Sequence, residues 1–178
     1  KNLVFGDFIR MEASTLCQLK CPVCIQNNGE TNILGKGYLK LGDFKKFIEE
    51  NPYIKKIELS SYGEMFLNPE LKDIIKYSYK KKIDLQVDNG VNLNTVSKEM
   101  LECLVKYKFR LIRVSIDGVS EETYRIYRIG GDFNRVIENI KTINFFKNKY
   151  NSRFPELIWQ FVIFGHNEQE LNAASKMA

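Results

Sequence analysis

The segment Cys17-Gln-Leu-Lys-Cys21-Pro-Val-Cys24 holds three of the four cysteines in this 178-residue sequence. It directly follows an apolar, strand-like run at residues 8–13. Three thiolates on one short loop are too many for a redox pair and one too few for a closed tetrahedral zinc site. A metal cluster with one unfilled coordination position fits this number of ligands.

A zinc ion is the alternative, and it would need a fourth ligand from elsewhere in the chain. Cys103 lies between Leu101 and Leu104 in a helical pattern, so it is expected to be a buried apolar thiol. His166, the one histidine, is predicted to be structural because no partner for it is evident. Either residue could approach in space, which leaves zinc open. A [4Fe–4S] cluster held by three cysteines needs no fourth side chain and is the preferred interpretation.

The composition is that of a globular protein, with 44% apolar and 28% charged residues. No apolar run reaches the roughly 18–20 residues that span a bilayer, and the first ten residues lack a signal-peptide pattern. The net charge of +5 is spread out and is not interleaved with aromatic residues, so neither a nucleic-acid platform nor membrane attachment is predicted. Clustered cysteines suit a reducing compartment, so a cytoplasmic location is expected.

Strand and helix patterns alternate from end to end. Five strands followed by helices predict an α/β fold with a parallel sheet and right-handed crossovers. The strands are predicted at 8–13, 54–60, 83–87, 111–116 and 157–164, and the helices at 41–50, 68–80, 97–106, 120–127, 132–149 and from 167 onward. The unusual residues all follow the ends of strands, where α/β folds place their active sites.

The C-x3-C-x2-C spacing after the first strand of a repeating strand–helix chain resembles the signature of the radical S-adenosylmethionine (radical SAM) superfamily. The resemblance implies a partial (β/α)6 barrel with about five βα units. Residues 1–178 would form one core domain that lacks the sixth unit and any C-terminal extension. The resemblance also implies that Cys17, Cys21 and Cys24 bind three irons of a [4Fe–4S] cluster, whose fourth iron is chelated by SAM.

Residues 61–65 are similar to the Gly-Gly-Glu-Pro segment that receives the SAM ammonium in this family. Gly63 and Glu64 are retained, whereas Tyr62 replaces the first glycine and Met65 the proline. A carboxylate that meets an ammonium group is chemically sensible, so these residues are expected to bind the cofactor.

Later loops carry similar resemblances. The fourth strand ends in Ser115-Ile-Asp117-Gly, which is similar to the family's Ser-x-Asp-Gly, so Ser115 is expected to bind SAM and Asp117 to face the substrate. Arg128 lies in a segment similar to Tyr-Arg-x-Gly-Gly-x-Phe and is expected to bind the methionyl carboxylate. After the fifth strand, Phe164 and Asn167 are expected to hold the adenine and the ribose.

Two further positions complete the expected site. Val23 stands where the family often has an aromatic residue against adenine, so its contact would be aliphatic. Asp88-Asn89-Gly resembles a Thr-Asn-Gly turn after the third strand, and Asp88 and Asn89 are candidates to contact the substrate. A plain turn remains an equal alternative for this segment.

The resemblance implies a radical SAM enzyme. Its reduced cluster would cleave SAM to a 5′-deoxyadenosyl radical that takes hydrogen from an unidentified substrate, with peptides and proteins among the candidates. Its later motifs look most like the branch that often carries a C-terminal auxiliary-cluster extension of the SPASM or twitch type. Reduced flavodoxin or ferredoxin is the expected electron donor. Two alternatives remain: a non-catalytic zinc- or iron–sulfur-binding structural or electron-transfer module, and a radical SAM relative without turnover.

Overall fold

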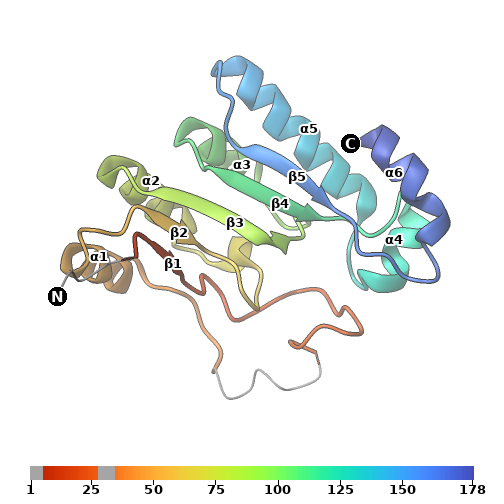
Figure 1. Ribbon diagram of the computed structural model, residues 1–178, viewed down its shortest axis with the longest axis horizontal. Coiled ribbons are helices and arrows are strands. Elements are labelled where there is room, and N and C mark those ends of the chain that lie inside the picture. The colour runs from red at the N-terminus through yellow and green to blue at the C-terminus, as the bar shows by residue number, and fades with distance from the viewer. Residues whose placement is uncertain (1–5, 28–34) are drawn as a thin grey trace.

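The computed structural model describes residues 6–27 and 35–178. Within them the chain forms a parallel sheet whose five strands stand in sequence order (Figure 1). The strands are β1 (Phe8–Arg10), β2 (Lys56–Glu58), β3 (Asp84–Val91), β4 (Leu111–Ser115) and β5 (Glu156–Gln160). Neighbouring strands pair in parallel throughout, so the predicted α/β class with five βα units is confirmed.

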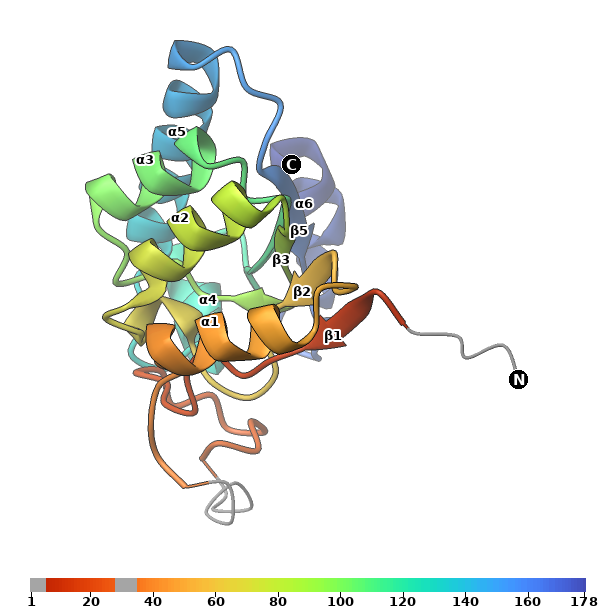
Figure 2. The same cartoon turned by 90° about the vertical axis from the view of Figure 1, so that its left-hand side faces the viewer.

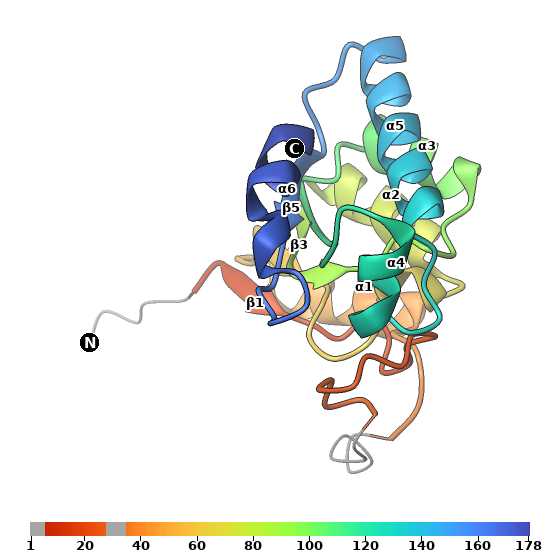
Figure 3. The same ribbon diagram turned by 90° about the vertical axis from the view of Figure 1, so that its right-hand side faces the viewer.

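Helices connect the strands and cover one face of the sheet, as Figure 2 shows for the helices that follow the first four strands. The α-helices are α1 (Leu41–Glu50), α2 (Leu71–Lys81), α3 (Lys98–Lys106), α4 (Glu121–Tyr127), α5 (Phe133–Lys149) and α6 (Leu171–Met177), and two short 3-10 helices are η2 (Met65–Leu67) and η3 (Glu168–Glu170). The side chains of Ser97, Ser120 and Asp132 cap α3, α4 and α5, since each accepts a first-turn N–H. Helix α6 lies beside the edge strand β5 (Figure 3).

Alternation along the strands separates the two faces of the sheet. Ile57, Leu85 and Ile112 are fully or almost fully buried beneath the helices. The residues next to them, such as Glu58 and Gln86, point to the opposite face because successive side chains of a strand alternate. The face of the sheet that points away from these helices, called the helix-free face below, is therefore polar. The apolar core lies between the sheet and the helices.

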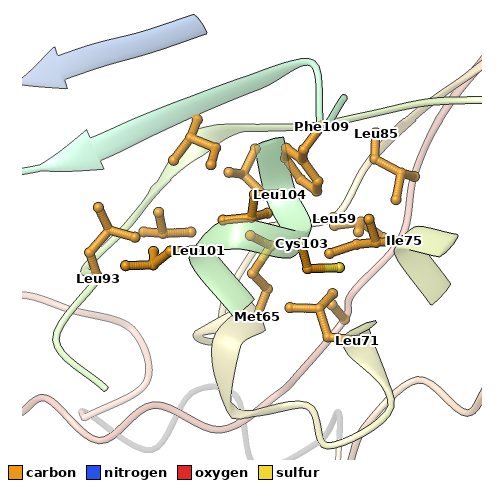
Figure 4. Packing of buried hydrophobic residues seen from close by; sticks show 14 of the residues in the cluster. Leu59, Met65, Leu71, Ile75, Leu85, Leu93, Leu101, Cys103, Leu104 and Phe109 are labelled. Atoms are coloured by element: carbon orange, nitrogen blue, oxygen red, sulfur yellow. The ribbon is translucent and has the colours of Figure 1, made fainter. Parts of the chain in front are cut away.

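Cys103 belongs to this apolar core. Its thiol lies among Leu71, Ile75 and Leu104 (Figure 4), and burial raises its pKa to about 11. The prediction that Cys103 is a buried apolar thiol is therefore confirmed.

The predicted end of the third strand was wrong. Strand β3 does not stop before Asp88 but continues to Val91, with a register shift between Val87 and Val91. The Asp88 N–H donates to the Glu58 carboxylate at 2.9 Å, and Gly90 supplies the positive φ of 98° that the irregular strand requires. The Asp88-Asn89-Gly segment is thus strand rather than a closing turn.

The predicted bounds of four other elements were wrong. Strand β5 ends at Gln160 and not at 164, because the Val162 N–H turns to Asp117 Oδ1 at 2.7 Å. Helix α2 begins at Leu71 and not at 68, because the Asn68 side chain is buried and donates to the Ala13 carbonyl. Strands β1 and β2 are also shorter than predicted.

Residues 11–27 leave β1 at its carboxyl end and pass along the edge of the sheet where the other strands also end (Figure 1). This placement brings the cysteine segment close to the loops that follow β2, β3 and β4. Among the residues that the structure describes, no helix has the length and apolar character needed to cross a bilayer.

Candidate functional site

The cysteine segment is anchored at both ends of its turn. Leu19 is buried, the Lys20 N–H donates to the Ile129 carbonyl at 2.9 Å, and the Cys24 N–H donates to the Cys21 carbonyl at 3.1 Å. Cys21 is buried, whereas Cys17 and Cys24 are half-buried. All four cysteines of the chain are free thiols, so the three of this segment are available as ligands.

The three thiols lie close enough to influence one another's ionisation. Burial raises the pKa of Cys17 to about 11, with further contributions from the charges of Glu64, Cys21 and Cys24. Burial also raises the pKa of Cys21, although the Arg128 charge opposes this shift. In the metal-free chain Cys17 and Cys21 are thus protonated at neutral pH, and a metal that binds them must displace their protons.

Two N–H donors point at these sulfurs. Arg128 Nη1 lies 3.7 Å from Cys21 Sγ, and Asn92 Nδ2 lies 3.9 Å from Cys17 Sγ. A metal-bound thiolate carries negative charge on its sulfur, and N–H donors stabilise that charge. The cysteine segment and its surroundings therefore fit a metal–thiolate site.

The arrangement of the donors bears on which metal this is. Within residues 6–27 and 35–178, no three His, Cys, Asp or Glu side chains are arranged to hold a single metal ion. A zinc ion, with Zn–S bonds of about 2.3 Å, would draw its thiolates to within about 4 Å of one another. A [4Fe–4S] cube binds each thiolate at a different iron and keeps the thiolates further apart. Three thiolates, each bound to its own iron, suit a cube whose fourth iron is open.

The loop after β2 packs tightly against the strand-like residues before the cysteines. A Cβ at Gly63 would lie 1.9 Å from the Ser14 carbonyl oxygen, so only glycine fits there. The Glu12 carboxylate accepts N–H bonds from Tyr62 at 2.8 Å and from Gly63 at 3.1 Å. The Tyr62 side chain is exposed. These contacts fix the loop beside the cysteine segment.

Glu64 is buried at the centre of the site. Its carboxylate accepts the Asn92 N–H at 2.8 Å and the Phe66 N–H at 3.2 Å. Burial raises its pKa to about 7, against the opposing effect of these two hydrogen bonds and of the Arg128 charge. Glu64 is therefore a buried carboxyl group that titrates near neutral pH.

Replacing Glu64 with Gln is expected to flatten the pH dependence of stability of the reduced, metal-free protein. The pKa of Glu64 is about 7 in the native state, against an ordinary value of 4.5 that applies to the unfolded chain. Between these two pH values the native state therefore keeps a proton on Glu64 that the unfolded chain has released. The wild-type free energy of unfolding should therefore fall as pH rises through that window, by about 3 kcal/mol more than in Glu64→Gln. Urea unfolding at a series of pH values measures this, and parallel profiles for the two proteins would contradict it.

The ends of β4 and α4 form a buried ion pair. Arg128 Nε donates to Asp117 Oδ2 at 2.6 Å, and Asp117 is completely buried. Burial acts to lower the pKa of Arg128, but the charges of Asp117 and Cys21 outweigh it and raise that pKa. Asp117 thus holds Arg128 and the Val162 backbone in this structure, rather than facing an open cavity.

Ser115 lies at the carboxyl end of β4, opposite Gln160 of β5. Its hydroxyl donates to Gln160 Oε1 at 3.3 Å. A Cβ at Gly90 would come within 2.3 Å of Ser115 Oγ, so the glycine leaves room for this hydroxyl. Ser115 therefore stands on the polar face near the cysteine end of the sheet.

The segment after β5 forms an aromatic stack. The ring centroids of Phe164 and Tyr127 are 4.3 Å apart, and the His166 ring stacks on Phe164 at 5.5 Å. Asn167 is fully buried, and its side chain bonds the Phe164 N–H and the Asp117 and Val162 carbonyls. Asn167 thus shapes the loop from within, and its contact with a nucleoside remains a prediction.

The remaining predicted site residues lie further out. Val23 is 76% exposed beside the cysteines. Asp88 forms an ion pair with Arg113, and Asn89 Nδ2 donates to the Ser61 carbonyl at 2.7 Å. Asp88 and Asn89 are both exposed where the polar face meets the loop after β2. The structure therefore brings Asn89 to the expected SAM loop.

The sequence reasoning missed several residues that hold the site together. Three lie outside the motif segments, and the fourth is a residue between the first two cysteines that the motif leaves unspecified: Glu12, Asn92, Gln160 and Gln18. The alternation of strand residues could have placed Glu12 and Gln160 on the polar face. No local pattern distinguishes Gln18 or Asn92, because most of their side-chain and backbone partners lie far away in the sequence.

Comparison with known proteins identifies the class of this fold and site. Residues 11–151 match the family described as the Radical SAM superfamily, and the chain belongs to that family. Proteins of this superfamily bind a [4Fe–4S] cluster and SAM.

Two curated proteins are similar to most of this chain. The chain is similar to the GTP 3′,8-cyclase of Clostridium botulinum, with 25% identity over 76% of this chain and 42% of that protein. It is also similar to an uncharacterised protein of Methanocaldococcus jannaschii, with 28% identity over 90% of this chain and 49% of that protein. The chain thus spans less than half the length of these relatives.

Solved structures share the fold. Streptococcus suis SuiB bound to its precursor peptide SuiA has a TM-score of 0.75 at 15% identity, covering 97% of this chain and 36% of SuiB. Methylornithine synthase has a TM-score of 0.57 at 14% identity, covering 78% of this chain and 41% of that protein.

Proposed function

We propose that this chain is the catalytic core of a radical SAM enzyme that acts on a peptide or protein. Cys17, Cys21 and Cys24 would hold a [4Fe–4S] cluster, and residues 1–178 would form one core domain. When bound, the cluster and SAM supply a 5′-deoxyadenosyl radical that takes a hydrogen atom from the substrate. Reduced flavodoxin or ferredoxin is the proposed electron donor.

The observation that carries this proposal is the meeting of three free thiols with complementary groups at one edge of the sheet. Arg128 and Asn92 direct N–H groups at two of the sulfurs, and the buried Glu64 accepts the backbone N–H of Asn92. Such donors suit a cluster that must be held in an anionic thiolate shell.

The neighbouring groups suit the charges of SAM. Glu64 and the segment around Gly63 provide an acidic group and a close-packed backbone for the SAM ammonium. Arg128 has further N–H groups beyond the one bound to Asp117 and can face the methionyl carboxylate. We assign Ser115 to the same ligand.

The adenosine end of SAM has its own expected contacts. We propose that Phe164 packs on the adenine, with Tyr62 and Val23 at the rim, and that Asn167 helps to hold the nucleoside. The aromatic stack of Tyr127, Phe164 and His166 supports a flat ligand at this place.

The peptide part of the proposal rests on two observations. SuiB, whose fold is similar, was solved with a precursor peptide bound. The helix-free face carries hydrogen-bonding and charged side chains, among them Asp88, Arg113 and Gln160. A polar face of this kind suits an amide-rich substrate, and we place the exposed Asp88 and Asn89 on the substrate side.

Anaerobic reconstitution with iron and sulfide tests the proposal. We expect a brown protein with about four iron and four sulfide per chain, which forms 5′-deoxyadenosine when incubated with dithionite and SAM. Arg128→Ala should lose a charge-assisted hydrogen bond to SAM, and Ser115→Ala a neutral one. Each variant should therefore bind SAM at least about tenfold more weakly while it keeps its iron.

The outcomes separate the competing functions. A colourless protein with one zinc per chain would establish the structural module instead. A fully loaded protein that binds SAM without cleaving it would point to a relative without turnover. Unchanged SAM affinity in both variants would remove Arg128 and Ser115 from the cofactor site.

A further inference from the structure

Asn92 connects the cysteine segment to the loop after β3. It is buried, and its side chain contacts both Cys17 and Gln18. Its backbone N–H is held by Glu64 Oε2 at 2.8 Å. None of the sequence motifs includes this residue, yet its amide lies against a predicted cluster ligand.

The orientation of the Asn92 amide is fixed by its neighbours. Asn92 Oδ1 accepts the backbone N–H of Asn94 at 2.9 Å, and a backbone N–H can bond only to the oxygen of an amide. Gln18 Nε2 donates to the same oxygen at 2.9 Å and to Thr95 Oγ1 at 3.1 Å. Asn92 Nδ2 must therefore be the atom that faces Cys17 Sγ, and the amide cannot turn without breaking these bonds.

We propose that Asn92 is a positioning residue that raises the reduction potential of the cluster through an N–H···S hydrogen bond to Cys17. This inference rests on the proposed function. Reduction adds one electron from a low-potential carrier, or from dithionite in the laboratory, and it breaks no bond. The added electron makes the thiolate sulfur more negative, so a hydrogen bond to that sulfur stabilises the reduced state more than the oxidised state.

Arg128 supplies a second donor, to Cys21, but its charge is shared with Asp117. Asn92 is neutral and has no assigned contact with SAM. Its effect on the cluster can therefore be measured separately from cofactor binding.

The test is an EPR-monitored redox titration of the reconstituted cluster without SAM, in wild type, Asn92→Ala and Asn92→Asp. Asn92→Asp keeps an oxygen for the Asn94 and Gln18 donors, loses the N–H group that faces Cys17 and adds a negative charge. We expect the ratio of reduced to oxidised cluster at a fixed potential to fall about tenfold in Asn92→Ala, which is about 59 mV for a one-electron couple. The fall should be larger in Asn92→Asp, because a carboxylate repels the added electron.

Asn139→Ala is the matched control. Asn139 is also a buried asparagine, and its side chain donates to the carbonyl of Leu93 at 2.7 Å. Leu93 is the residue that follows Asn92 in the sequence. It should lose stability but keep the wild-type midpoint.

The results distinguish the inference from the function beneath it. Wild-type midpoints in either loaded Asn92 variant would overturn the inference, as would an equal fall in Asn139→Ala. Failure of the wild-type protein to bind iron would instead overturn the proposed function.

Discussion

The triple variant Cys17→Ala, Cys21→Ala and Cys24→Ala is expected to lose the iron–sulfur cluster completely. Each replacement removes a thiolate ligand, and within the described residues Cys103 is held in the core and cannot substitute for them. Iron and sulfide analysis and the visible absorption of the reconstituted protein measure this loss.

Cys103→Ala is the control for that experiment. It deletes a buried thiol from α3 among Leu71, Ile75 and Leu104, so we expect a stability loss of order 1 kcal/mol and a normal cluster. A normal cluster in the triple variant, or its disappearance in Cys103→Ala, would overturn the ligand assignment.

Gly63→Ala is expected to have the largest effect on the protein fold. Its added Cβ would meet the Ser14 carbonyl oxygen at 1.9 Å and the Leu16 carbonyl oxygen at 2.8 Å, and backbone atoms cannot move aside as a side chain can. We expect a loss of at least about 3 kcal/mol in the free energy of unfolding. Cluster loading should fall as well, because the loop separates from the cysteine segment.

Gly42→Ala provides the opposite result. Gly42 lies exposed in α1, and a Cβ there has no atom within 4 Å. Alanine should stabilise the helix by about 0.5–1 kcal/mol. Urea unfolding of the metal-free proteins compares the two variants, and a mild effect of Gly63→Ala would mean that the loop after β2 is not packed as described.

The cysteine ligands and the order of elements could be predicted because both depend on local sequence. The spacing of Cys17, Cys21 and Cys24 identifies a loop of ligands, and hydrophobic periodicity identifies strands and helices. The helix caps at Ser97 and Ser120 were predictable for the same reason, since a cap bonds to its own first turn.

The contacts that assemble the site could not be predicted, because they join distant segments. Asp117 bonds Arg128 and the Val162 backbone, and these partners come together only when β4 and β5 are paired. The continuation of β3 through Gly90 depends likewise on the reach of Glu58 from the neighbouring strand. Sequence patterns give the donors and acceptors but not which of them meet.

The two faces of the sheet have a consequence for how a domain of this fold can diversify. Core positions such as Leu85 and Ile112 alternate with polar positions such as Gln86 and Arg113 on the same strands. Mutations at the polar positions change the chemistry presented to a ligand without creating cavities in the core. Selection can therefore change the polar face one strand residue at a time, while the neighbouring residue preserves the architecture.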